Sequence, residues 1–163
     1  MNRILTTHCG SLPRPHDLLD LMKAKVNGQP YDAGAYERRV RKAVADAVRK
    51  QADTGIDILS DGEQSKPGFF TYVKERLAGF EARPGAHVAF FEAERAAFPE
   101  YYKEYFARAM LGGSVTPVVP MVCTGPVSYR GANALARDIE TLKAALSGVQ
   151  AEAVFMPAVA PSG

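Results

Sequence analysis

The chain has few of the residues that build metal centres and disulfide frameworks. Its 163 residues include two cysteines and three histidines. It contains no Cys-x-x-Cys or His-x-x-x-His spacing, the usual sequence sign of a zinc site. Cys9 and Cys123 lie far apart, which indicates reduced thiols and a cytoplasmic protein, with a single disulfide as the open alternative. We therefore expect no zinc bound by this chain's own residues.

Long apolar runs and a strong net charge are also lacking. No apolar segment is long enough to cross a bilayer, and the N-terminus has no signal-peptide core. The net charge of +2 gives no reason to expect nucleic acid or an anionic membrane. The basic cluster Arg38-Arg39-Val40-Arg41-Lys42 is interrupted by an apolar residue, so we interpret it as a solvated helix face. Neither nucleic acid nor a membrane is an expected partner.

The apolar spacing alternates between helical and strand-like segments. It predicts helices over about 16–27, 35–54, 69–77 and 133–147, and short strands over 4–7, 56–59, 115–119, 121–123 and 153–156. Gly79 is expected to close the third helix, and Thr124-Gly125-Pro126 is expected to form a turn. The region 81–113 fits neither pattern and is interpreted as an excursion or a lid.

Strands that alternate with helices predict an α/β fold with a parallel sheet. The chain holds about four such units, whereas a closed TIM (β/α)8 barrel needs about 250 residues. We therefore predict a partial barrel, about the first half, as a single domain over residues 1–163. Such a half-barrel would expose an open sheet edge, which favours self-association.

Polar side chains crowd the ends of two predicted strands. The first loop is Thr6-Thr7-His8-Cys9-Gly10-Ser11-Leu12-Pro13-Arg14-Pro15, and the second is Asp57-Ile58-Leu59-Ser60-Asp61-Gly62-Glu63-Gln64. Parallel strands bring their carboxyl ends to one edge of a sheet. We therefore expect Ser11 and Glu63 to lie at the same end of the sheet, in an enzyme-type pocket for a small molecule.

Within these loops Glu63 is the strongest single candidate. Its carboxylate can hold a substrate ammonium group or act as a general base, and the structural alternative is a first-turn acid of the next helix. Asp61 flanks the same turn and either pairs with Glu63 or only forms an Asp-Gly turn. Gly10 and Ser11 offer N–H groups and a hydroxyl to an anion, or else form a simple turn.

The remaining polar residues give weaker signals. His8 and Cys9 are adjacent in an extended segment and point to opposite faces, so we reject this pair as metal ligands. His16 and His87 are isolated and are expected on the surface. A triad of Ser11, His8 and Asp61 would define a small hydrolase, but no nucleophile-elbow sequence accompanies it.

Several motifs together carry a family resemblance. They are the two strand-end loops, with the second extended to Gly55-Ile56, then Tyr72-Val73 through Leu77, Gly79-Phe80 and Thr124-Gly125-Pro126-Val127. In order and spacing they resemble the cobalamin-independent methionine synthase family, in its C-terminal catalytic-barrel type and its shorter stand-alone relatives. The resemblance runs through nearly the whole chain.

The resemblance implies a TIM barrel and a zinc-dependent methyltransferase. In that family zinc activates a thiol, such as homocysteine, for attack on the methyl group of a folate, 5-methyltetrahydrofolate, in methionine biosynthesis. Related enzymes use other thiols, including coenzyme M. A bound cation lowers the pKa of a thiol, and the thiolate is the nucleophile. The implied partners are therefore a small-molecule thiol and a methyl donor.

The resemblance also assigns residues. Cys9, Gly10 and Ser11 match an Ile-Gly-Ser segment that holds the amino-acid substrate, and Glu63 matches the glutamate that binds its amino end. Asp61 stands where full-length synthases usually have His, which indicates the stand-alone branch. His8 and Asp61 are expected to support these residues from just behind them.

The family's zinc ligands, a His-x-Cys pair and a later Cys, have no match in this chain, and neither does its catalytic His. The chain therefore resembles the N-terminal half of the barrel, which carries part of the substrate site and no metal or catalytic residues. On this interpretation the isolated chain is inactive. The alternative from another class is a non-catalytic, truncated α/β fragment or interaction module.

Overall fold

A computed structural model describes residues 3–68, 72, 75–83, 91–105 and 120–158. The chain divides into two compact units. The first joins residues 1–66 to residues 132–163, and the second spans residues 67–131. Each unit is described by itself.

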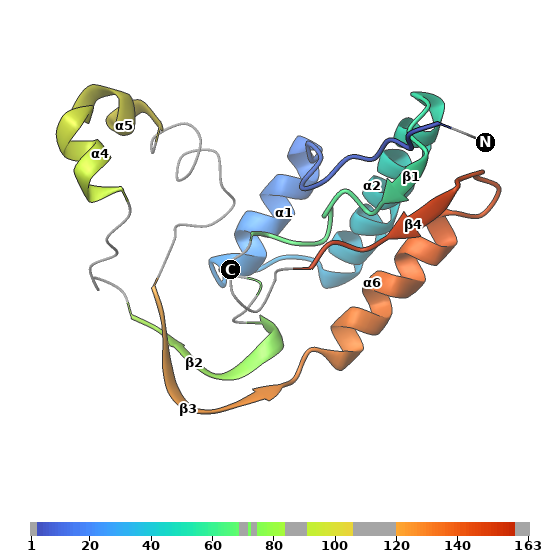
Figure 1. Ribbon diagram of the computed structural model, residues 1–163. Coiled ribbons are helices and arrows are strands. Elements are labelled where there is room, and N and C mark those ends of the chain that lie inside the picture. Colours follow the sequence, from blue (N-terminus) through green and yellow to red (C-terminus); the bar gives the residue numbers. More distant parts are fainter. Residues whose placement is uncertain (1–2, 69–71, 73–74, 84–90, 106–119, 159–163) are drawn as a thin grey trace. The chain divides into compact units, whose positions relative to one another are not determined.

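The first unit contains three helices and two strands among the described residues (Figure 1). They are α1 (His16–Val26), α2 (Ala33–Asp53), β1 (Ile58–Ser60), α6 (Ala132–Ala145) and β4 (Ala153–Phe155). Strands β1 and β4 pair in parallel, with Leu59 opposite Val154. A mixed α/β arrangement with parallel strands is therefore confirmed, and the described residues do not form a closed barrel.

The predicted strand over 4–7 forms only one isolated bridge in the structure. Thr7 forms an isolated parallel bridge with Ile58, and the carbonyl of Thr6 accepts hydrogen bonds from the N–H groups of Asp57 and Ile58 at 3.2 and 3.0 Å. The segment therefore lies beside β1 without forming a regular strand.

The helices of the first unit follow the predicted apolar spacing. Leu18 and Met22 of α1 are buried, as are Val40, Val44 and Val48 of α2, because residues four apart share one helix face. Helix α2 begins two residues before the predicted start. The reason lies at residue 32, where the Asp side chain accepts a hydrogen bond from the N–H group of Ala35 at 2.9 Å and caps the helix.

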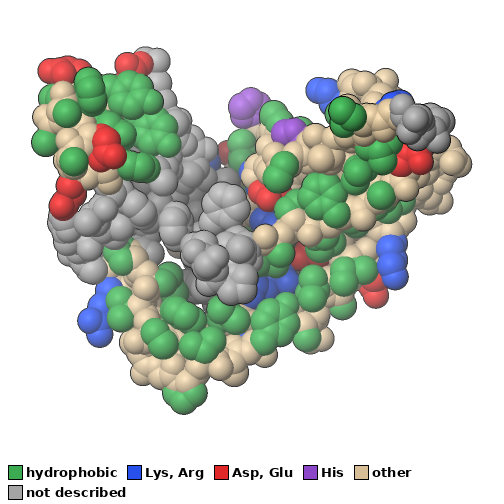
Figure 2. All heavy atoms as spheres, viewed as in Figure 1, with side chains coloured by type: hydrophobic (Ala, Val, Ile, Leu, Met, Phe, Trp, Pro, Cys, Tyr) green, Lys and Arg blue, Asp and Glu red, His purple; other side chains and the backbone are tan. Residues whose placement is uncertain are grey.

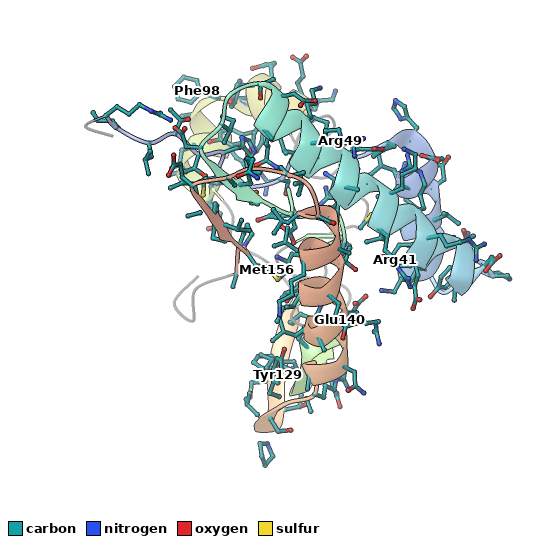
Figure 3. The ribbon with its side chains drawn as sticks, turned by 90° about the vertical axis from the view of Figure 1, so that its right-hand side faces the viewer. Arg41, Arg49, Phe98, Tyr129, Glu140 and Met156 are labelled. Atoms are coloured by element: carbon teal, nitrogen blue, oxygen red, sulfur yellow. The ribbon has the colours of Figure 1, made fainter. Side chains whose placement is uncertain are left out.

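The basic cluster lies on α2. Arg38, Arg41 and Lys42 are 72%, 63% and 67% exposed, and the last two form ion pairs with acids four residues away. Arg39 is less exposed and binds Asp17 of α1. Figure 3 shows Arg41 projecting from the same helix. The interpretation as a solvated helix face is thus confirmed for three of the four basic residues.

The second unit departs from the predicted parallel order. Strands β2 (Leu77–Ala82) and β3 (Met121–Tyr129) pair in antiparallel fashion. Residues 72, 75 and 76 are helical as predicted, but the chain is already in β2 at Leu77, so the predicted helix end at Gly79 is wrong. The predicted turn at Thr124-Gly125-Pro126 is also wrong, because these residues lie within β3, at a shift in its register with β2. A Cβ at Gly79 would lie 2.6 Å from the carbonyl oxygen of Pro126. Glycine is needed at position 79 because the two strands approach closely there. In the sequence alone, the same residue looks like the end of a helix.

The predicted excursion over 81–113 contains two short helices in its described part. Helices α4 (Glu92–Ala97) and α5 (Pro99–Tyr105) contain no buried residue. Aromatic rings of Phe91, Tyr101, Tyr102 and Tyr105 contact one another, with centroids 5.2–6.0 Å apart. Figure 2 shows hydrophobic side chains gathered with acidic ones over α4 and α5.

Three expectations lie outside the described residues. They are most of the predicted helix over 69–77, the strand over 115–119, and the surface position of His87. Among the described helices, none combines the length and apolar character that crossing a membrane requires.

Candidate functional site

The loop after β1 has an unusual backbone. Gly62 and Glu63 both adopt the left-handed conformation, with φ of 60° and 56°. A Cβ at Gly62 would lie 3.0 Å from Cδ1 of Leu12, and the N–H group of Leu12 donates to the carbonyl of Gly62 at 3.0 Å. Glycine is therefore needed at position 62 for both its φ and the close approach of the first loop. Glu63 has a Cβ, so its conformation must be held by neighbours.

Amide side chains fix the two ends of this loop. The Gln51 side chain exchanges two hydrogen bonds with the backbone of Ser60, at 2.9 and 3.2 Å, and so joins the end of α2 to the end of β1. The Gln64 side chain donates to the carbonyls of Leu12 and Gly62 at 3.1 and 3.3 Å. Both glutamines are buried, so these bonds satisfy backbone groups that water cannot reach.

Glu63 and Ser11 are in direct contact. The hydroxyl group of Ser11 donates a hydrogen bond to Oε2 of Glu63. Glu63 is only 7% exposed, whereas Ser11 is exposed. The other carboxylate oxygen, Oε1, accepts no hydrogen bond from any residue that the structure describes. A mostly buried carboxylate with one open oxygen favours a cationic partner.

Arg14 binds the backbone of the same loop. Its Nη2 donates to the carbonyl oxygens of Glu63 at 2.7 Å and Lys66 at 2.5 Å. Burial lowers the pKa of Arg14, and the negative charge of Glu63 opposes that shift. The guanidinium group thus remains a cation that binds the backbone of Glu63 without a hydrogen bond to the carboxylate.

Asp61 and Lys66 form a second, buried pair. Their side chains are 3% and 10% exposed, with Nζ 3.7 Å from Oδ2. Oδ1 of Asp61 accepts the N–H group of Glu63 at 2.9 Å, and Nζ of Lys66 donates to the carbonyl of Pro157 just after β4. Burial raises the pKa of Asp61, and the ammonium group of Lys66 opposes that shift. This pair joins the loop after β1 to the loop after β4.

The predicted site residues fall into two groups. Ser11, Glu63 and Asp61 lie together around the loop after β1. Cys9 is exposed, and Gly10 has a φ of 94° with open space around it. These two residues flank the contact without joining any described hydrogen bond.

His8 lies near this loop but does not join it. Its Nε2 is buried without a hydrogen-bond partner among the described residues. The Ser11 hydroxyl donates to Glu63, so no hydrogen bond links the residues of the hydrolase-type triad.

Arg14 and Lys66 are the two charged residues that sequence reasoning missed. Arg14 stood in the quoted motif, but two flanking prolines marked the segment as an irregular loop. For Lys66, the available signal was a long cation three residues after the candidate carboxylate Glu63. Among the described residues, no three His, Cys, Asp or Glu side chains gather in a way that could hold a metal ion.

These observations define an α/β protein with a charged, loop-built site at the carboxyl ends of parallel strands, as in many α/β enzymes. The profile of a family described as "Cobalamin-independent synthase, Catalytic domain" matches residues 4–95. The match includes both loops of the site and more than half of the chain. The chain therefore belongs to the cobalamin-independent synthase family.

Named relatives agree with this assignment. A 5-methyltetrahydropteroyltriglutamate–homocysteine methyltransferase of Bacillus mycoides is 28% identical over 94% of this chain and 23% of the relative. The enzyme of the same name from Vibrio vulnificus is 26% identical over 82% of this chain and 19% of the relative. The one from Mycolicibacterium paratuberculosis is 35% identical over 47% and 10%. The chain thus spans less than a quarter of the length of each of these relatives.

Proposed function

We propose that this chain supplies the part of a homocysteine-type methyltransferase site that holds the amino-acid end of the thiol. The observation that carries the proposal is the Glu63 carboxylate, which is mostly buried, bound by Ser11 on one oxygen and open on the other. An α-ammonium group at Oε1 would neutralise this charge and complete its hydrogen bonds. The relatives' printed names, which specify homocysteine, fit a substrate with such a group.

The proposed role of the other residues follows from their contacts. Ser11 orients the Glu63 carboxylate, and its neighbours Cys9 and Gly10 offer backbone N–H groups at the exposed side of the same loop. Lys66 forms an ion pair with Asp61, and Arg14 binds backbone carbonyls, so Oε1 of Glu63 is the carboxylate oxygen left to a cationic ligand.

The reaction itself needs groups that the described residues do not provide. Zinc would lower the pKa of the thiol, and a 5-methyltetrahydrofolate would donate the methyl group. The described residues do not fit a zinc site. The function proposed for these residues is therefore substrate binding, within part of a parallel (β/α) barrel. The cytoplasm is the proposed location.

A comparison of two thiols tests the proposal. Calorimetric titration of the whole chain with L-homocysteine and with coenzyme M separates the two substrate classes, because coenzyme M has a sulfonate and no ammonium group. We expect L-homocysteine to bind and coenzyme M to bind at least about tenfold more weakly, since its anion faces Glu63. Tighter binding of coenzyme M would assign the chain to the coenzyme M-type alkyltransferases of the family instead.

The variant Glu63→Gln tests the residue itself. Loss of a hydrogen bond to a charged partner should weaken L-homocysteine by about 1.5–3 kcal/mol. The matched control is Glu140→Gln, an exposed acid of α6 (Figure 3) that should leave the affinity unchanged. Unchanged binding with a lowered melting temperature in Glu63→Gln would instead give the residue a structural role.

A second candidate function is a non-catalytic association module. It is favoured by exposed apolar side chains beside the parallel strands, with Ile4 92% and Val154 39% exposed. Among the described residues, β4 pairs with β1 alone, so its other edge can accept a strand of a second copy. Sedimentation of the chain and of Val154→Lys tests this. A concentration-dependent dimer that the variant abolishes supports it, and a monomer in both contradicts it.

A further inference from the structure

We propose that Arg14 is a positioning residue that sets the direction of the Glu63 carboxylate, and the inference rests on the proposed function of Glu63. Arg14 makes no hydrogen bond to that carboxylate in the described structure. Its Nη2 binds the carbonyl oxygens of Glu63 and Lys66 at 2.7 and 2.5 Å. Arg14 thus acts on the backbone that carries the ligand-binding group.

The backbone at Glu63 needs such a constraint. A φ of 56° is uncommon for a residue with a Cβ, and it persists only where the surroundings over-determine it. The Glu63 N–H group is held by Asp61, and its carbonyl accepts both the N–H group of Lys66 at 3.1 Å and the guanidinium group of Arg14. The amide and carbonyl of this one residue are therefore each fixed from a different direction.

Arg14 and Ser11 belong to the same loop, so the backbone contact and the side-chain contact to Glu63 are linked. Arg14 lies three residues after Ser11, which binds the Glu63 carboxylate. One loop therefore contacts Glu63 at two points, at the side chain through Ser11 and at the backbone through Arg14. Pro13 and Pro15 flank Arg14 and restrict the loop between these points. Moving the loop moves both contacts together, so the carboxylate keeps its direction relative to Ser11.

The competing role for Arg14 is direct binding of the substrate carboxylate. Two ligands separate the roles, namely L-homocysteine and 4-mercaptobutanoate, which has the same thiol and carboxylate and lacks the amino group. Positioning of Glu63 affects only the ligand with an ammonium group, whereas carboxylate binding affects both ligands.

The first experiment measures both affinities by calorimetry in the whole chain and in Arg14→Met. We expect the L-homocysteine affinity to fall about tenfold or more, the scale of a lost hydrogen bond to a charged group, while that of 4-mercaptobutanoate is unchanged. Arg14→Lys, which keeps the charge and can still donate to a carbonyl, should recover part of the loss. An equal loss for both ligands would overturn the inference.

A double-mutant cycle adds a second criterion. If Arg14 acts through Glu63, Arg14→Met should cause no further loss of L-homocysteine affinity in a chain that already has Glu63→Gln. Additive losses would mean that the two residues act independently and would also overturn the inference.

The last experiment needs no ligand and separates this inference from the proposed function. Hydrogen exchange of the amides of Glu63 and Lys66 should accelerate about tenfold or more in Arg14→Met, while the amides of α2 stay protected. If the wild-type chain binds neither thiol, the proposed function fails, and accelerated exchange still supports backbone positioning by Arg14. Unchanged exchange at Glu63 and Lys66 overturns the positioning in every case.

Discussion

The two units of the chain bury side chains to very different extents. In the first unit Leu18, Val48 and Leu59 are fully buried. In the second, α4 and α5 contain no buried residue, and Phe98 and Tyr101 are 63% and 60% exposed. All the residues of the candidate site belong to the first unit. The comparison teaches that the loops of the candidate site belong to the unit with the more deeply buried side chains.

The largest expected effect tests this contrast in packing. Leu18→Ala removes a fully buried side chain from α1 and should destabilise the first unit by about 2–5 kcal/mol. Phe98→Ala removes a mostly exposed ring from the second unit and should cost much less, because little burial is lost. Urea unfolding monitored by circular dichroism measures both. Equal losses would mean that the aromatic residues of α4 and α5 are packed in solution and would remove the contrast.

A second pair of variants asks whether the units unfold separately. Gly62→Ala and Gly79→Ala both force a Cβ into a left-handed residue with close neighbours, and each should cost about 1–3 kcal/mol. Hydrogen exchange should show lost protection at β1 and β4 in the first variant and at β2 and β3 in the second. Gly55→Ala also has a positive φ but has open space around it, so it serves as the milder control. If one substitution lowered protection in both units, the two units would unfold as one cooperative structure.

An acid titration tests how the ionised side chain of Asp57 stabilises the first unit. Arg3 and the backbone and hydroxyl groups of Thr6 hold the pKa of Asp57 well below its usual range. The folded state therefore keeps Asp57 ionised at a lower pH than the unfolded chain does. Its stabilisation is complete above the ordinary aspartate pKa of about 4 and is lost as the pH falls below that value.

The destabilisation caused by Asp57→Asn should have the same pH dependence. The loss of unfolding free energy relative to wild type should be present at pH 7 and shrink as the pH is lowered through the acid range. Urea midpoints measured across that range check this. Asp46→Asn removes an exposed partner of Lys42 and should show a small effect at every pH. A constant difference between Asp57→Asn and wild type would mean that Asp57 stabilises the fold without its charge.

The smallest expected effect concerns the surface of α2. Lys42 and Asp46 form an exposed i,i+4 pair at 2.9 Å, so Lys42→Ala should change the unfolding free energy by less than about 0.5 kcal/mol. Thermal melts at low and high salt measure it. A larger, salt-dependent loss would show that the first unit depends on its surface charges as well as its core.

The sequence was a good guide where one structural rule governed a segment. Helices α1, α2 and α6 follow the 3.6-residue period, because each buries one face against a core. The prediction that Ser11 and Glu63 lie at one end of the sheet came from parallel strands that deliver their ends to one edge, and residues 4–7 keep this direction through one parallel bridge with β1. Both predictions needed only local pattern and topology.

The predictions failed where tertiary contacts, and not the local sequence, determine the conformation or the partners of a residue. Gly79 and Pro126 are breakers by local preference, yet they lie in strands β2 and β3, whose pairing no local pattern reveals. Arg14 and Lys66 escaped notice because their partners are carbonyl oxygens, which every residue has. Only the folded chain decides which carbonyls a long cation reaches.

The hydrogen bonds between Gln51 and Ser60 also have a consequence for the order of folding. They join residues nine apart in sequence, whereas the pairing of Ile58 with Ala153 must close a loop through most of the chain. Short loops close faster and at a lower entropic cost than long ones. We therefore expect the segment from α1 to β1, with the bend that carries Glu63, to form early, and β4 to dock against it last. The ligand-binding loop would then serve as the template on which the remainder of the first unit assembles.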